Sequence, residues 1–173
     1  MIGTLMRGLL VIVLGLLVWP EFARYRAEWS LREVNVRLDR ALQGVDRGQA
    51  ALQSVGAAAL LAKDATKRLP ADPRPPLLEG IALILLGKGS AAQSLLDAAV
   101  QEGERPELTL NQGRARALLG DEAGALSAYL RTAWASPLAI ESLPASMRAD
   151  LRQQVVQLEA QLGAGTLKAP PGG

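Results

Sequence analysis

The chain has 173 residues and a formal net charge of +2, and 49% of its residues are apolar although only 3% are aromatic. It contains no cysteine and no histidine, which excludes disulfides, thiol nucleophiles, Cys or His metal sites and every triad with a histidine base. No phosphate-binding Gly-rich loop or spaced carboxylate cluster is present, so we expect a non-enzymatic protein with no catalytic residues, metal or cofactor. Its arginines alternate with acidic residues and lack an aromatic stacking platform, which argues against a nucleic-acid partner.

The N-terminal segment predicts a membrane anchor over residues 1–23. Between Ile2 and Trp19 only Arg7 is charged, and eighteen helical residues cover roughly 27 Å, close to the thickness of a hydrocarbon core. Arg7 can reach the nearer headgroups. A cleaved signal peptide is the alternative, but Ala23 and Ala27 are not spaced as a small-x-small cleavage site, so we expect the segment to be retained.

Aromatic residues follow the predicted span at steps of three or four, which places them on one helical face. Such residues are typical of a membrane–water interface, and the arginines from Arg24 to Arg40 suit anionic lipid headgroups. The predicted membrane interface comprises Arg7, Trp19, Phe22, Arg24, Tyr25, Arg26 and Trp29.

The charges around the span leave its orientation open. The arginines that follow it favour a cytoplasmic domain by the positive-inside rule. A short basic start, an apolar run and Pro20 instead resemble an uncleaved export signal. We expect a single pass through a bacterial inner membrane with the soluble domain in the periplasm.

Residues 24–48 predict a juxtamembrane amphipathic helix that Gly44 and Gly48 loosen at its end. Its apolar stripe either packs on the rest of the chain or forms a coiled-coil seam, so self-association stays open. Gly8 and Gly15, seven residues apart in the anchor, share a face that could admit a partner helix. The stripe consists of Leu31, Val34, Leu38, Leu42 and Val45.

Residues 49–144 contain a repeat with a period of 33 residues. A repeat of this length predicts helical hairpins that bury their apolar faces only by stacking. The run from Ile81 to Leu86 is also short enough for a buried strand, but the Ala-rich sequence after it and the repeat register favour a helix. The matching positions are Gly80, Gly87, Ala92, Leu96 and Ala99 in one copy, and Gly113, Gly120, Ala125, Tyr129 and Thr132 in the next.

This pattern resembles tetratricopeptide repeats over about Ala50 to Pro137. In that family small residues mark the crossing of the two helices, a glycine lies in the turn between them and a proline closes the unit, as Pro137 does here. Ala58, Ala62, Ala65 and Pro70 fit the second helix of a preceding copy whose first helix is degenerate.

The C-terminal part predicts a capping helix over residues 145–162, with an apolar stripe on one side and charges on the other. A disordered Gly/Pro tail over residues 163–173 is expected after it. The predicted fold is therefore all-α: a transmembrane helix, a short repeat solenoid resembling tetratricopeptide repeats and a C-terminal cap.

The resemblance implies a concave surface, lined by the first helix of each hairpin, that binds protein partners. We expect a membrane-anchored scaffold that helps to assemble a larger membrane or envelope complex. A secreted periplasmic peptide-binding protein, released by signal-peptide removal, is the alternative. The expected groove residues are Leu77, Ile81, Ile84 and Leu85 in one copy and Leu110, Arg114, Ala117 and Leu118 in the next.

Overall fold

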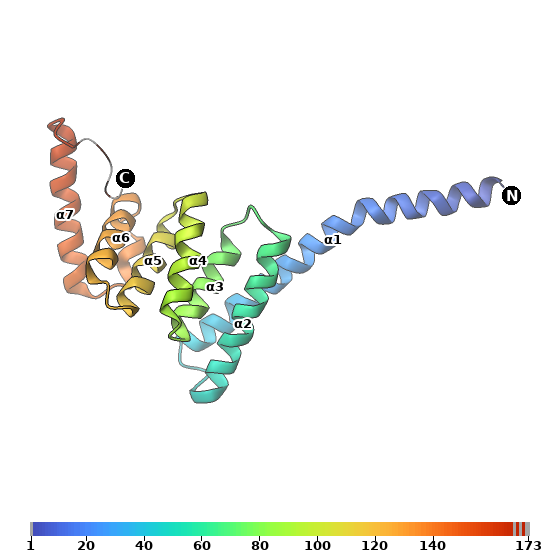
Figure 1. Ribbon diagram of the computed structural model, residues 1–173, viewed down its shortest axis with the longest axis horizontal. Helices are drawn as coiled ribbons and strands as arrows, with labels where there is room; N and C mark the ends of the chain where they lie inside the picture. Colours follow the sequence, from blue (N-terminus) through green and yellow to red (C-terminus); the bar gives the residue numbers. More distant parts are fainter. Residues whose placement is uncertain (1, 168, 170, 172–173) are drawn as a thin grey trace. The chain divides into compact units, whose positions relative to one another are not determined.

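The computed structural model describes residues 2–167, 169 and 171, and the side chains of residues 2–13, 16, 17 and 20 lie outside that description. All regular elements in this part are helical, which confirms the predicted all-α class (Figure 1). Residues Ile81–Leu85 end a helix, and Leu86 lies in the turn after it. The chain divides into two compact units, Met1–Pro75 and Pro76–Gly173. The elements are α1 (Ile2–Leu42), α2 (Gly48–Arg68), α3 (Arg74–Leu85), α4 (Gly89–Glu102), α5 (Pro106–Leu118), α6 (Glu122–Ala135), the 3-10 helix η1 (Ala139–Ser142) and α7 (Ala145–Gly163).

The first unit is a helical hairpin of α1 and α2. Buried residues recur at three- and four-residue steps along both helices, and those of α2 are mostly alanines, which lets the two backbones approach closely. Three of the five residues of the predicted stripe, Leu31, Val34 and Leu38, are at most 3% exposed and pack within the hairpin, whereas Leu42 and Val45 are 62% and 57% exposed. The buried residues are Ala27, Leu31, Val34 and Leu38 in α1 and Val55, Ala58, Ala62 and Ala65 in α2.

Ion pairs close both ends of this hairpin. At the turn, Arg40 Nη2 lies 2.9 Å from Asp46 Oδ1, and Gly44 and Gly48 adopt positive φ angles of 68° and 59°. At the other end, Arg74 Nη2 lies 2.5 Å from Glu28 Oε1. The α1–α2 pair is thus the first hairpin of the chain, and the helix that sequence reasoning treated as degenerate is the C-terminal part of α1.

Helix α1 is uninterrupted, so the segment predicted as an anchor and the juxtamembrane helix are a single element. Figure 1 shows that α2 lies beside only the C-terminal part of α1, and the N-terminal part reaches well beyond it. No helix in the described part of the chain is both long and apolar enough to cross a membrane. The side chain of Arg7 and most of those of the predicted span lie outside that part.

The second unit repeats one hairpin geometry at the 33-residue period. In the α3–α4 hairpin, Gly80 lies against the side chain of Leu96, and in the α5–α6 hairpin Gly113 lies against the ring of Tyr129. A Cβ atom at either glycine would come closer than 3.0 Å to that neighbour. The same pair of positions therefore sets the closest approach of the two helices in both copies.

The turns inside the two hairpins also match. Gly87 and Gly120 have positive φ angles of 70° and 79°. In each turn the glycine N–H donates to the carbonyl three residues earlier, at 2.9 and 3.0 Å, and the next N–H donates to the carbonyl five residues earlier, at 2.9 and 3.0 Å. This hydrogen-bond pattern ends a helix with a left-handed residue, a conformation in which glycine avoids the steric cost of a Cβ.

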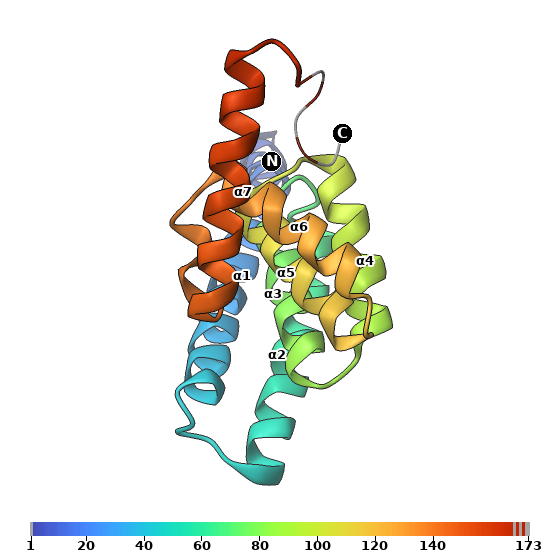
Figure 2. The ribbon, with the colours of Figure 1, turned by 90° about the vertical axis from the view of Figure 1, so that its left-hand side faces the viewer.

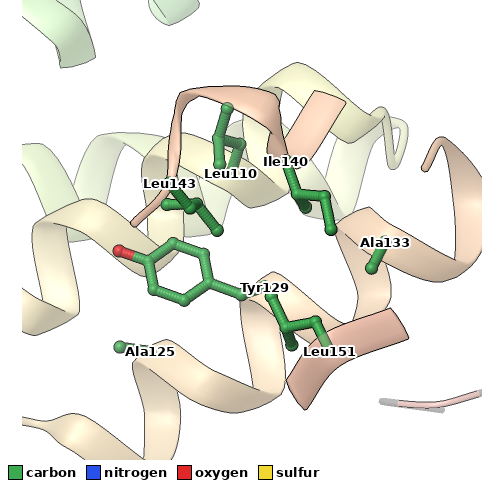
Figure 3. Close-up of a cluster of buried hydrophobic side chains, with 7 residues drawn as sticks. All are labelled: Leu110, Ala125, Tyr129, Ala133, Ile140, Leu143 and Leu151. Atoms are coloured by element: carbon green, nitrogen blue, oxygen red, sulfur yellow. The ribbon is translucent and has the colours of Figure 1, made fainter. Parts of the chain in front are cut away.

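Two apolar clusters hold the second unit together. One joins α4 and α5 around Leu96 and Leu108, with Leu77, Leu83 and Ile84 of α3 packed against it. The other, drawn in Figure 3, joins α5, α6, η1 and α7 around the ring of Tyr129 and consists of Leu110, Ala125, Tyr129, Ala133, Ile140, Leu143 and Leu151.

Helix α7 covers the end of the repeat stack in this unit. Figure 2 shows it alongside α6, and Leu151 is fully buried, with Met147 and Val155 packed against the same cluster. The other side of α7 carries exposed polar residues, including Asp150 and Arg152. This division of the surface is the one expected of a capping helix.

Candidate partner-binding surface

The first half of the predicted groove row lies on α3. Leu77 and Ile84 are half-buried and pack against the α4–α5 cluster. Ile81 is also half-buried, and Leu85, at the end of the helix, is 36% exposed. Leu85 is therefore the residue of this copy that offers most surface to a partner.

The second half of the row lies on α5, where the 3-10 helix η1 covers part of it. Leu110 is 8% exposed and belongs to the cluster around Tyr129. Arg114 Nη2 donates to Ser142 Oγ at 2.7 Å, which ties its guanidinium to η1. Ala117 and Leu118 remain exposed, and Leu118 occupies the same place in its repeat as Leu85.

Sequence reasoning missed η1 and its effect on this face. The segment is four residues long, too short for a periodic pattern, yet Ile140 inserts into the core and is fully buried. The sequence signal was a short group of apolar residues between Pro137 and Pro144, which does not reveal where the segment packs.

A polar network joins α4, α5 and α6 on another side of this unit. Gln112, 4% exposed, donates its Nε2 to Asp97 Oδ1 at 2.5 Å and accepts a hydrogen bond from Arg131. Arg116 Nη2 also reaches Asp97 Oδ1, at 3.4 Å, and Arg131 Nη1 lies 3.6 Å from Glu104 Oε1. Because both the amide nitrogen and the amide oxygen of Gln112 are hydrogen-bonded, the network fixes the relative positions of α4, α5 and α6.

This network was not predicted because α5 is buried on nearly every side. The residues from Leu108 to Gly113 are buried one after another, including Thr109, Asn111 and Gln112. A helix that contacts α4, α6 and η1 shows no amphipathic period, so polar residues in it resemble surface residues in the sequence.

A small cavity of about 160 Å³ lies beside this network. Trp134 and the aliphatic parts of its neighbours give it a mainly apolar wall. It is smaller than the clefts that ordinarily hold a drug-sized ligand. Its lining residues are Glu104, Arg105, Pro106, Thr109, Arg131, Trp134, Ala135 and Pro171.

No set of three or more acidic side chains in the described part of the chain is placed to hold a metal ion. Burial raises the pKa of the Tyr129 phenol above its ordinary value, and Tyr129 serves as a core residue. The hydrogen bond from Arg40 lowers the pKa of Asp46 at the α1–α2 turn.

The aromatic residues of the predicted membrane interface lie on α1 and point away from the hairpin. Trp19 is 72% exposed, and Phe22, Tyr25 and Trp29 are exposed to a similar degree. Trp29 Nε1 donates to the Tyr25 hydroxyl at 3.3 Å, and Arg24 pairs with Glu21 at 3.1 Å. Arg24 and Arg26 are exposed beside them.

Comparison of the chain with protein-family models, with curated proteins and with solved structures gave no match.

Proposed function

We propose that this chain is a membrane-anchored, non-enzymatic scaffold of the tetratricopeptide-repeat type, which binds protein partners and helps to assemble a larger membrane or envelope complex. The observation that carries the proposal is the repeated contact of Gly80 with Leu96 and of Gly113 with Tyr129. Two hairpins built on the same close contact form a stackable unit, and stacked units of this kind present extended surfaces to other proteins.

The exposed leucines that end the first helix of each hairpin are the proposed partner contacts. Leu85 and Leu118 occupy equivalent repeat positions, and Leu119 beside the second is 45% exposed. Apolar side chains exposed at equivalent positions suit an apolar peptide or helix better than a charged ligand.

The proposed membrane anchor is the N-terminal part of α1. The sequence from Ile2 to Trp19 contains one charge, and α1 continues without a break into the hairpin. A helix that leaves the bilayer in this way holds the repeat unit near the membrane, and the arginines from Arg24 to Arg40 suit anionic headgroups. We place the hairpins in the bacterial periplasm.

Membrane fractionation tests the anchor. The full-length chain should stay with the membrane pellet after an alkaline carbonate wash, and its intact mass should include residues 1–23. A soluble product that lacks these residues would instead indicate the secreted peptide-binding protein. Alkaline phosphatase fused to the C-terminus should be active, because the enzyme folds only in the periplasm; an inactive fusion would reverse the orientation.

Affinity purification from native membranes tests the scaffold. Leu85→Glu combined with Leu118→Glu should abolish the partners recovered with the wild type while helicity stays unchanged, because both side chains are exposed. The matched control is Val156→Glu combined with Leu162→Glu on α7, which adds the same two charges at positions that are 63% and 55% exposed. Partner recovery that survives the double substitution, or is lost equally in the control, would contradict the proposed surface.

A further inference from the structure

Helix α1 has a second apolar face, which the hairpin leaves uncovered. Successive residues of an α-helix turn by about 100°, so Trp29 lies roughly 160° around the helix from the buried Leu31. The residues on this outer face are about 60% exposed, whereas those facing α2 are buried. We call this surface the outer seam; it consists of Gly15, Val18, Phe22, Tyr25 and Trp29.

The spacing of the outer seam is that of a coiled coil. Its members follow one another at alternating steps of three and four residues, the seven-residue period of helices that supercoil around a partner. In the sequence the same steps continue back to Val11 and Gly8. Arg32, at the next position, ends the apolar run because a cation there would face a second cation.

Lipid covers only the first part of this seam. From Trp19, the last residue of the apolar run, a rise of about 1.5 Å per residue places Trp29 about 15 Å further along the helix axis. The headgroup layer on one side of a bilayer is only about 5–8 Å thick. Tyr25 and Trp29, joined by a hydrogen bond of 3.3 Å, therefore reach beyond the lipid and present their rings to water unless another protein covers them.

The charges beside the seam favour a second copy in parallel orientation. In a parallel coiled coil a residue flanking the seam meets the residue five positions later on the partner helix, which would join Glu21 to Arg26. Arg26 has no side-chain partner among the described residues, and Glu21 holds only an exposed pair with Arg24. One heptad later, Glu28 would face Glu33 of the second copy. Each of these carboxylates is already paired with an arginine of its own chain, Arg74 for Glu28 and Arg37 for Glu33, which offsets the repulsion between them.

We propose that two copies of this chain pair in parallel through the outer seam, from Gly15 to Trp29. The inference rests on the proposed membrane anchor, because insertion in the same direction places identical helices parallel and raises their effective concentration. Each copy then keeps its α1–α2 hairpin, since the seam and the hairpin use opposite faces of α1.

Cysteine cross-linking in native membranes tests the pairing, and the natural chain contains no cysteine to interfere. Full-length Tyr25→Cys and Trp29→Cys variants should form a disulfide-linked species of twice the chain mass under mild oxidation. The matched control is Arg24→Cys, an exposed position on another face of α1 at the same height as Phe22 and Tyr25, and it should cross-link several-fold less. Equal cross-linking at seam and control positions, or a product that contains a different protein, would overturn the proposal.

A charge placed in the seam provides the second measurement. Combining Trp29→Glu with the reporter Val18→Cys should reduce the dimer band several-fold, while helicity stays the same because Trp29 is exposed. An undiminished band would refute the seam. Carbonate washing of the same membranes separates the two hypotheses. A chain that resists extraction but stays monomeric would contradict the dimer alone, whereas a chain that is washed off would contradict the membrane anchor.

Discussion

Gly113 lies directly against the ring of Tyr129, and 33 residues earlier Gly80 lies against Leu96 in the same way. The two hairpins thus share one close contact although their large residues differ, one aromatic and one aliphatic. A glycine on the first helix makes room for whichever side chain the second helix supplies. This contact is the structural counterpart of the sequence repeat.

Replacing either glycine with alanine should destabilise the protein. The new Cβ of Gly113→Ala would overlap a ring that is itself only 4% exposed, and overpacking of this kind costs about 1–3 kcal/mol. Urea unfolding measures the change. Gly56→Ala on α2 is the control, because no atom lies within 4 Å of its Cβ position, and it should raise stability by about 0.5–1 kcal/mol.

A double-mutant cycle separates the ring contact from other effects of Gly113→Ala. In a Tyr129→Ala background the overlap is gone, so the glycine substitution should no longer destabilise the protein. An unchanged penalty in that background would show that the ring is not the obstacle.

Thr109 and Thr132 form a buried hydroxyl pair across α5 and α6, with their Oγ1 atoms 2.8 Å apart. Both side chains are at most 1% exposed. Either Thr→Val substitution should lower the free energy of unfolding by about 1 kcal/mol, and the double variant should show a coupling of about 0.5–1.5 kcal/mol. Thr66→Val is the control, because that hydroxyl bonds only to its own helix, at Ala62 O.

Gln112 connects Asp97 and Arg131, so its loss should loosen the packing of α4, α5 and α6. Gln112→Leu keeps the approximate size but leaves two partly buried charged groups short of a partner, at an expected cost of about 1–3 kcal/mol. Thermal unfolding of this variant is compared with that of Gln101→Leu, an exposed glutamine of α4. Equal stability of the two variants would mean that the network contributes nothing.

The Arg40–Asp46 pair should make the α1–α2 turn sensitive to acid. The hydrogen bond from Arg40 lowers the pKa of Asp46 below its ordinary value. The pair therefore stabilises the fold above the ordinary carboxyl pKa, and this contribution is lost as the pH falls through the lowered pKa of the folded protein. An NMR titration should show the pKa of Asp46 rising toward its ordinary value in Arg40→Gln.

The matched control for the titration is Arg47→Gln. Arg47 lies beside the same turn, but its guanidinium donates to the Gly44 carbonyl and not to Asp46. The pKa of Asp46 should be the same in this variant as in the wild type. A shift of similar size in both variants would point to a general charge effect.

The hairpins could be predicted from the sequence because their markers are local. Gly87 and Gly120 end helices at positions that need a positive φ, and the alanines of α2 recur at helical steps. The packing of η1 over α5 could not be predicted in this way. Arg114 has the spacing of a groove residue, but its hydrogen bond to Ser142 depends on a segment 28 residues later.

By itself the sequence determined the all-α class, the 33-residue period, the hairpin turns and the long apolar start of the chain, because these depend on residues close to one another. Only the tertiary structure decided which faces are used. The Leu31–Leu38 stripe packs on α2, Leu110 lies beneath η1, and the aromatic residues of α1 are left exposed on the opposite face. The reason is physical: periodicity shows that a helix has an apolar face, whereas the partner that covers it is set by long-range packing.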